Sequence, residues 1–335
     1  MELTLFWFIL IAVLFVGFFV LEGFDYGVGI LLPFTGKSDR ERRLIIRTIG
    51  PVWDGNEVWM ITAGGALFAA FPHVYATMFS GFYLALFLML MALIMRGVAF
   101  ELRDKHQALA WRRTWDGAIF FGSFLPAFLW GVAVTDLLAG VPIGPGKTYQ
   151  GNFLDLLTVY SILGGLTFLL VFAYHGAAFL GLRLSDEGLK RRAKLFGQRL
   201  GGLAILSFVL FMAMTHSHTD LFAKGAAAMA LIAAAAVFVL GYLALQRNSF
   251  KGAFALSSGA IALTTAAVFL GLFPRLMVSS LNPAWSLTVE NAASTPYTLS
   301  VMTVAAVCLV PVVLIYQGWC YYVFRRRISD GDLGH

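Results

Sequence analysis

Residues 5–33 read LFWFILIAVLFVGFFVLEGFDYGVGILLP, an apolar run whose only charged side chains are two carboxylates. The run is longer than the roughly 20 apolar residues that a helix needs to cross the hydrocarbon core of a membrane. Similar runs recur to the end of the chain, in which 59% of the 335 residues are hydrophobic and 13% are charged. Soluble domains carry about 25% charged residues. We therefore expect residues 1–335 to form one all-α integral membrane domain.

Nine membrane spans are predicted from runs of this kind, at about 5–33, 55–71, 74–98, 116–139, 157–182, 200–216, 221–245, 254–275 and 299–324. The first lacks the basic flank and the cleavage site of a signal peptide, so we expect it to remain in the protein. Of the 24 Lys and Arg residues, 21 lie in alternate loops and the C-terminal segment, and the others are Lys147, Lys224 and Arg275. Because basic loops stay in the cytoplasm, this pattern predicts an outside N-terminus and a cytoplasmic C-terminus.

Carboxylates inside the predicted spans are the most informative residues, because a charged side chain at the bilayer centre costs about 2.5–3.5 kcal/mol. Glu22 and Asp25 interrupt the first span, and their spacing of three places them on one face of a helix. Asp54 and Glu57 repeat this spacing at the start of the second span, within PVWDGNEVW at 51–59. The predicted topology places all four carboxylates in the cytoplasmic half of the membrane.

Two interpretations of these carboxylates remain open. Carboxylates that cluster in a region of low dielectric disfavour one another's ionisation, so some of them can carry a proton near neutral pH. This favours a relay that takes up protons from the cytoplasm. The other interpretation is a static set of ion pairs with Arg96, which ends the third span beside Glu101 on the same side, and with loop arginines. For Asp54 and Glu57 a helix capping box is a further alternative.

The sequence shows no pattern typical of a catalytic or metal site. Only His175 lies deep inside a predicted span, and bis-histidine haem ligation needs two facing histidines. A lone histidine there is more typical of a packed, hydrogen-bonded residue. The net charge of +6 is not gathered into a basic face with interleaved aromatics, so we expect no nucleic-acid partner. We expect this chain alone to hold no catalytic residues and to bind no cofactor or metal.

Several motifs together resemble subunit II of the cytochrome bd-type quinol oxidases. They are GFDYGVG at 23–29, WDGNEVW at 53–59, ITAGGALFAAFP at 61–72, GSFLP at 122–126 and GWCY at 318–321. The similarity extends over the whole chain and is densest in residues 20–126. Motifs of this length are specific, because chance matching over so many positions is improbable.

The resemblance implies nine spans in two four-helix bundles plus one helix, in the cytoplasmic membrane of a bacterium or archaeon. It implies a heterodimer with a subunit I that carries b-type and d-type haems. That complex would oxidise quinol and reduce dioxygen to water with protons from the cytoplasm. The chain itself would be haem-free and would support assembly, the stability of haem d and proton uptake. A bound quinone, an oxygen channel in this subunit and a small accessory single-span subunit are left open by the resemblance.

Carried over to this sequence, Asp25, Trp53 and Asp54 match family positions implicated in the haem d region and in proton uptake. Asp54 is the strongest candidate for proton uptake. Glu22 stands where other members have aspartate, so the carboxylate is kept. Glu57 stands where some members have glutamine, which makes it a weaker candidate for carrying protons.

Arg96 and Glu101 belong to a further similar block, residues 96–105, and are expected to have a structural role near the haem d region. Two other classes of function also fit the carboxylates. A secondary transporter or proton channel places carboxylates at breaks in membrane helices, and it would carry substrate flux without another subunit. A purely structural scaffold would tolerate neutralisation of all four carboxylates.

Overall fold

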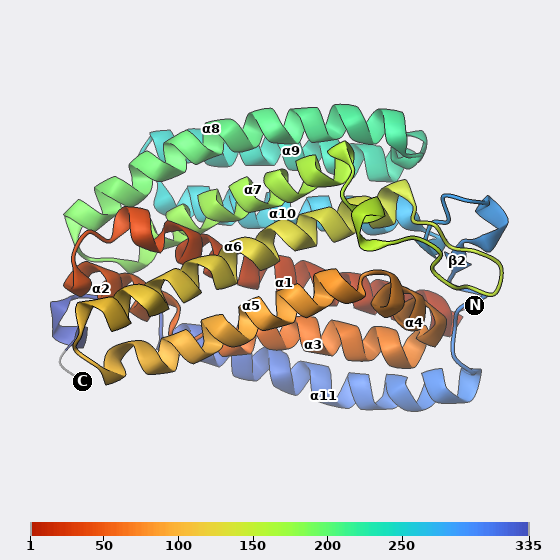
Figure 1. The fold of residues 1–335 in the computed structure, drawn as a ribbon, viewed down its shortest axis with the longest axis horizontal. Coiled ribbons are helices and arrows are strands. Elements are labelled where there is room, and N and C mark those ends of the chain that lie inside the picture. Colours follow the sequence, from red (N-terminus) through yellow and green to blue (C-terminus); the bar gives the residue numbers. More distant parts are fainter. Residues whose placement is uncertain (1, 334–335) are drawn as a thin grey trace.

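Nearly all of the apolar sequence folds into long helices that lie side by side along one axis (Figure 1). The computed structural model describes residues 2–333, so residues 1, 334 and 335 of the predicted domain lie outside the described part. The long helices are α1 (Glu2–Thr35), α3 (Trp53–Ala70), α5 (Tyr83–Leu102), α6 (Leu109–Ala139), α7 (Val159–Arg183), α8 (Glu187–His218), α9 (Gly225–Gln246), α10 (Phe250–Leu272) and α11 (Pro296–Val323). The shorter elements are α2 (Asp39–Ile49), α4 (Pro72–Gly81) and the 3-10 turns η1 (Arg103–Lys105), η2 (Phe153–Leu156), η3 (Leu221–Ala223), η4 (Pro283–Trp285) and η5 (Asp330–Leu333).

Eight helices of the described chain are long and apolar enough to cross a membrane, namely α1 and α5 to α11. The predicted span at 55–71 does form a helix, α3, but α3 is not among these eight. It begins with the polar stretch 54–57 and contains several glycines, which lower its hydropathy. α3 nevertheless runs beside α1 and α11 along the bundle (Figure 1).

The prediction of a single helix over 74–98 is wrong, because the chain breaks at Phe82 into α4 and α5. The loop after α6, residues 140–158, holds α4 in place. The hydroxyl of Thr77 donates to the carbonyl of Lys147 at 2.6 Å, and a Cβ at Gly81 would lie 2.6 Å from a ring carbon of Tyr149. These contacts come from residues distant in sequence, so the apolar pattern of 74–98 gives no sign of the break.

Helices at the opposite end of the bundle continue beyond the predicted spans. α6 begins at Leu109 rather than at 116, and α8 begins at Glu187 rather than at 200. The added segments are rich in Leu, Lys and Arg, which are good helix formers. The amphipathic helix α2 was not predicted, although Ser38 and Glu41 form a capping box at its start. Apolar length therefore locates the spans but not the ends of the helices.

A small sheet lies at the end of the bundle that holds the N-terminus (Figure 1). β1 (Arg275–Met277) pairs antiparallel with β2 (Leu287–Thr288). Val141 of the 140–158 loop forms a bridge to Ser279 beside them. Both strands lie in the connection between α10 and α11, and the bridge joins this connection to the 140–158 loop. The sheet is a small exception to the predicted all-α fold.

The core is built around α1, which packs against α3, α6, α7 and α10. Glycines allow α1 and α7 to approach closely: a Cβ at Gly27 would lie 1.9 Å from the carbonyl oxygen of Phe172, and a Cβ at Gly176 would lie 2.3 Å from the carbonyl carbon of Gly27. Small residues permit this kind of helix contact in membranes. As a result, residues 22–32 of α1 are buried without interruption.

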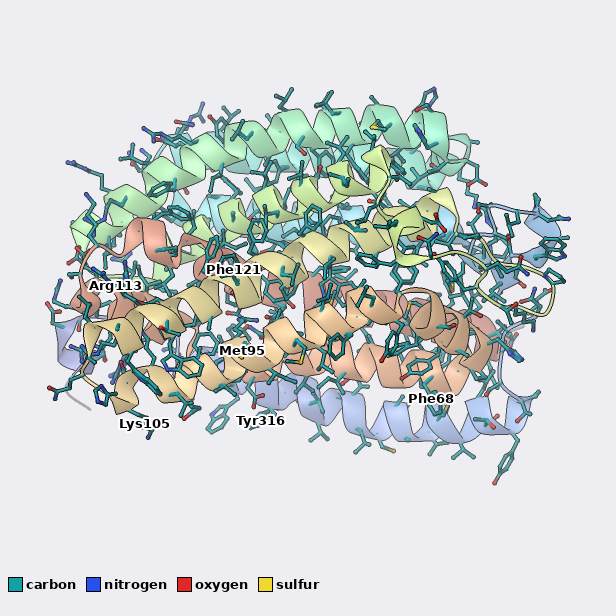
Figure 2. All side chains as sticks on the ribbon, viewed as in Figure 1. Phe68, Met95, Lys105, Arg113, Phe121 and Tyr316 are labelled. Carbon is teal, nitrogen blue, oxygen red and sulfur yellow. The ribbon has the colours of Figure 1, made fainter. Side chains whose placement is uncertain are left out.

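Apolar side chains cover the sides of the bundle, as expected where lipid is the solvent. Phe68, Met95, Phe121 and Tyr316 project outward from different helices (Figure 2). The basic side chains of Lys105 and Arg113 instead lie at the end opposite the N-terminus (Figure 2). We call this end, which also carries α2 and the start of α8, the basic end.

Candidate functional site

Glu22 and Asp25 lie on the buried face of α1, and both side chains are completely excluded from solvent. Their spacing of three brings them to neighbouring positions on the helix. They are buried because α3, α6, α7 and α10 surround this half of α1. The sequence prediction of two carboxylates on one helix face is confirmed.

A single arginine connects Glu22 to two other helices. Arg96 of α5 is completely buried, and its Nη1 donates to Oε1 of Glu22 and, at 3.1 Å, to Oε1 of Glu57 on α3. The guanidinium carbon also lies 5.0 Å from the centre of the Tyr26 ring. α1, α3 and α5 are thus joined by one buried ion-pair group.

The charges of this group do not balance if every carboxylate is ionised. Arg96 is the only cation hydrogen-bonded to these carboxylates within residues 2–333, and it lies among Glu22, Asp25 and Glu57. Uncompensated charge in a buried region is costly, so protonation of the group is favoured. Oε2 of Glu22 and Oδ1 of Asp25 are buried and have no hydrogen-bond partner among the described residues. Each of these oxygens can accept a proton.

Asp25 is held from the other side by Asn56, a residue that the sequence analysis did not single out. Asn56 is completely buried, and its Nδ2 donates to Oδ2 of Asp25 at 2.6 Å. The oxygen of Asn56 accepts the hydroxyl of Tyr321 at 2.7 Å and the Nε2 of Gln317 at 3.2 Å, both from α11. The site therefore includes α11 as well as α1, α3 and α5.

Helical periodicity offered a signal for Asn56. The buried residues of α3 are Asn56, Ala63, Leu67 and Ala70, which are spaced seven, four and three apart. This spacing is typical of one helix face, so Asn56 shares its face with small and apolar residues. The intervals from Asp54 to these positions do not follow that pattern, and Asp54 is exposed.

Not all predicted site residues meet. Asp54 lies exposed in the first turn of α3, and Glu101 is exposed near the end of α5. Trp53 is half-buried and packs against the ring of Phe100 at 5.0 Å between centroids. The structure brings together Glu22, Asp25, Glu57 and Arg96, and it leaves Asp54 and Glu101 on the surface of this chain.

The alternatives for these carboxylates have different outcomes. The capping box at Asp54 and Glu57 is wrong, since Val52 is the N-cap of α3 and no side chain caps that helix. Ion pairs with Arg96 are present at Glu22 and Glu57. The pairs thus exist together with carboxylate oxygens that are still able to accept a proton.

Loop arginines form a separate network at the basic end. Arg103 donates from Nε to Asp116 at 2.6 Å and from Nη2 to Asp39 at 2.9 Å. Arg42 reaches Asp116 at 2.8 Å, and Arg112 reaches Asp39 at 2.6 Å. These pairs fasten α2 to η1 and to the start of α6, and none of them includes the carboxylates of α1.

His175 is buried and hydrogen-bonded at both ring nitrogens, as predicted for a packed residue. Nδ1 lies 2.7 Å from the hydroxyl of Ser257, and Nε2 lies 3.1 Å from the carbonyl oxygen of Val20. The ring stacks on Phe254 with centroids 4.6 Å apart. In the described residues, no three His, Cys, Asp or Glu side chains form a group that could hold a metal ion.

A separate apolar cavity of about 100 Å³ lies in the half of the bundle nearer the N-terminus. Phe15, Met89, Trp130 and Phe269 are among the side chains that line it, and none of its lining residues is charged. Such a cavity suits an apolar occupant. It shares no lining residue with the buried carboxylate site.

Fold and site together define a multi-span helical membrane protein that buries an arginine and a surplus of carboxylates between its helices. The chain belongs to the cytochrome bd terminal oxidase subunit II family, whose sequence profile matches residues 3–324. The resemblance found in the motifs is confirmed, and the chain is accordingly a subunit of an oxidoreductase complex.

Relatives with this description are similar over almost their whole length. Identity is 45% over 328 residues with cytochrome bd ubiquinol oxidase subunit 2 of Bacillus subtilis (strain 168), covering 97% of each chain. It is 37% over 362 residues with cytochrome bd-I ubiquinol oxidase subunit 2 of Escherichia coli (strain K12), covering 98% of this chain and 95% of the relative. The solved structure of bd oxidase from Geobacillus thermodenitrificans has the same fold, with a TM-score of 0.77, 18% identity and coverage of 97% of this chain and 99% of that one.

Proposed function

We propose that this chain is the haem-free subunit II of a membrane complex that oxidises quinol and reduces dioxygen to water, and that it conducts protons from the basic end toward the reaction. The observation that carries the proposal is the buried group of Glu22, Asp25, Glu57 and Arg96, in which carboxylates outnumber the cation. Haems in subunit I would supply the redox chemistry. The side chains of this chain hold and move protons.

Asp54 is the proposed point of proton uptake. It is exposed at the first turn of α3, which starts at the basic end, and it lies three residues before Glu57 on the same helix. A proton taken up there would pass to Glu57 and then to Glu22, whose carboxylates are held close together because both accept from one nitrogen of Arg96. Asp25 is the inner acceptor next to Glu22 on α1.

Subunit I is proposed to cover α3. The exposed face of α3 carries Asp54, and Gly55, Gly64 and Gly65 have open space around an added Cβ. The carboxylate of Asp54 is poorly suited to lipid, although Ile61 and Phe68 are also exposed on α3. Exposed glycines permit a neighbouring helix to come close. Asp54 and Trp53 would then lie at the subunit interface, in line with their expected role near haem d.

The orientation and bundle arrangement are further parts of the proposal. α3 would act as the ninth span, since it runs beside α1 and α11. Packing of α1 on α3 and α6 and of α5 on α6 supports one bundle, and packing among α7 to α10 supports a second, with α11 as the additional helix. The two bundles would meet where α1 and α6 pack against α7. Since 21 of the 24 basic residues lie on the side that the sequence predicts to be cytoplasmic, the basic end would face the cytoplasm of a bacterial cell.

The proposal is tested with Asp25→Asn and Glu22→Gln in the purified complex. We expect turnover to fall at least about a hundredfold, the lower end of the usual range for loss of a proton-transfer group, or haem d absorption to be lost. Glu187→Gln serves as a control, because Glu187 is a solvent-exposed carboxylate at the basic end. Normal oxygen consumption with normal haem spectra in both variants would contradict the proposal.

A further inference from the structure

A chain of hydrogen bonds with one direction ends at Asp25. It begins at Trp59 of α3, whose indole nitrogen can only donate and lies 2.6 Å from Oε1 of Gln317. This fixes the amide of Gln317, so that its Nε2 turns toward Oδ1 of Asn56 at 3.2 Å. The hydroxyl of Tyr321 donates to the same oxygen at 2.7 Å.

The direction of the Asn56 amide follows from these donors. Since its oxygen accepts two hydrogen bonds, its nitrogen is the atom that faces Asp25. A reversed amide would place the Nε2 donor of Gln317 against an NH₂ group, and an amide oxygen against an ionised carboxylate. Asn56 therefore always presents an N–H to Oδ2 of Asp25, and a proton on Asp25 is directed to the other oxygen, Oδ1.

The donors come from a helix that is otherwise loosely attached. Leu299 is the only buried residue that the structure describes in α11. Besides Gln317 and Tyr321, α11 is tied at its far end, where the indole of Trp7 donates to Thr303 at 3.0 Å. The packing of α11 against α3 thus determines whether Gln317 and Tyr321 can fix the orientation of the Asn56 amide.

We propose that Asn56 is a positioning residue for proton transfer at Asp25, and that Tyr321 and Gln317 of α11 set the direction of its amide. This inference rests on the proposed role of Asp25 in proton uptake. An N–H donor favours the ionised form of a carboxylate, so the α11 contacts would keep Asp25 ready to accept a proton.

Other charged groups around Asp25 also influence its protonation. They are Glu22 on α1, Glu57 on α3 and Arg96 on α5, together with the hydroxyl of Tyr321 on α11. Glu22, Glu57 and Arg96 stay in place when the donors to Asn56 are removed, and Gln317→Leu removes a donor to Asn56 without removing the hydroxyl of Tyr321. A change in pH dependence on removing those donors can therefore be attributed to the amide.

The test measures oxygen consumption against pH in the purified two-subunit complex for Asn56→Leu, Tyr321→Phe and Gln317→Leu. We expect the pH profile of Asn56→Leu to move to higher pH by about one to two units, the scale of a lost hydrogen bond to a charged group. Tyr321→Phe and Gln317→Leu should each move the pH profile to higher pH by less than Asn56→Leu does. The double variant should move it by nearly as much as Asn56→Leu. Tyr322→Phe is the matched control, since Tyr322 is the exposed neighbour on α11.

The outcomes separate this inference from the proposed function. If Asp25→Asn impairs turnover while the Asn56, Tyr321 and Gln317 variants keep the wild-type pH profile, the positioning role is overturned and the role of Asp25 stands. If Asp25→Asn has wild-type turnover, both fall. If Asn56→Leu loses haem absorption, the pH profile is instead measured in Tyr321→Phe, which removes only one oxygen atom. An unshifted pH profile in the double variant Tyr321→Phe with Gln317→Leu overturns the inference.

Discussion

Arg96 hydrogen-bonds Glu22 although neither side chain has any contact with solvent. A buried pair of this kind adds little net stability over apolar residues, but removing one partner leaves an uncompensated charge. The same guanidinium nitrogen also contacts Glu57. Arg96 consequently joins α1, α3 and α5 through two of their carboxylates.

Arg96→Leu is expected to destabilise the protein by about 3–5 kcal/mol, the usual cost of breaking a buried pair from one side. The measurement is the yield and thermal stability of the complex after detergent extraction. Glu22→Leu combined with Arg96→Leu should recover part of the loss, because no charge at Glu22 is then left without its partner. Arg113→Leu, at an exposed position of the basic end, is the control. A double variant no better than Arg96→Leu would contradict the pairing.

Asp54→Asn is expected to lower turnover at least about a hundredfold while leaving the fold of this chain unchanged. The reason is that Asp54 is exposed in this chain and makes no contact that folding requires. Oxygen consumption per haem is the measurement. Normal turnover would exclude Asp54 as the point of uptake and direct attention to Glu57, whose side chain is partly exposed.

Enlarging Gly65 tests the proposed contact with subunit I. A Cβ added at Gly65 has no atom of this chain within 4 Å, and Gly65 is exposed, so we expect the chain with Gly65→Leu to insert and fold normally. We expect the amount of subunit I that co-purifies with it to fall at least about tenfold, which corresponds to roughly 1.4 kcal/mol of binding free energy. Ala233→Leu, an equally exposed small-to-large change on α9, should leave co-purification unchanged. Equal recovery of subunit I with both variants would place the interface elsewhere.

The C-terminal segment is held at the basic end by a pH-sensitive contact. The hydrogen bond from Arg40 to Asp330 holds the pKa of that carboxyl below its ordinary value of 3.8. Because the pKa of Asp330 is lower in the folded protein than in the unfolded chain, the contact stabilises the folded segment fully above pH 3.8. This stabilisation is lost as the pH falls through the pKa that Asp330 has in the folded protein. Amide exchange at Ile328, which donates to the carbonyl of Arg183, should accelerate below pH 4 relative to intrinsic rates. Arg40→Gln should remove this pH dependence, and an unchanged dependence would contradict it.

Much of the fold could be predicted from apolar length alone, but features set by tertiary contacts could not. The break at Phe82 depends on Thr77 and Gly81 meeting the 140–158 loop, which no local pattern reveals. α3 was predicted as a span like the others, yet its polar start and glycines separate it from the eight apolar helices of the described chain.

The site was predicted in part for a similar reason. Glu22 and Asp25 stand out because carboxylates are rare in an apolar run. Asn56 is a neutral residue between two acids, and only the burial pattern of α3 distinguishes it from Asp54. Tyr321 lies 265 residues further along the chain from Asn56, so a single sequence could not bring them together.

Proton uptake coupled to turnover tests the central claim most directly. The complex would be placed in vesicles, and a pH-sensitive dye on the side of the basic end would follow the protons consumed per dioxygen reduced. We predict rapid uptake on that side in the wild type, and uptake slowed together with turnover in Asp25→Asn and Glu22→Gln. Uptake at the wild-type rate in both variants, or uptake from the side that holds the N-terminus, would contradict the account.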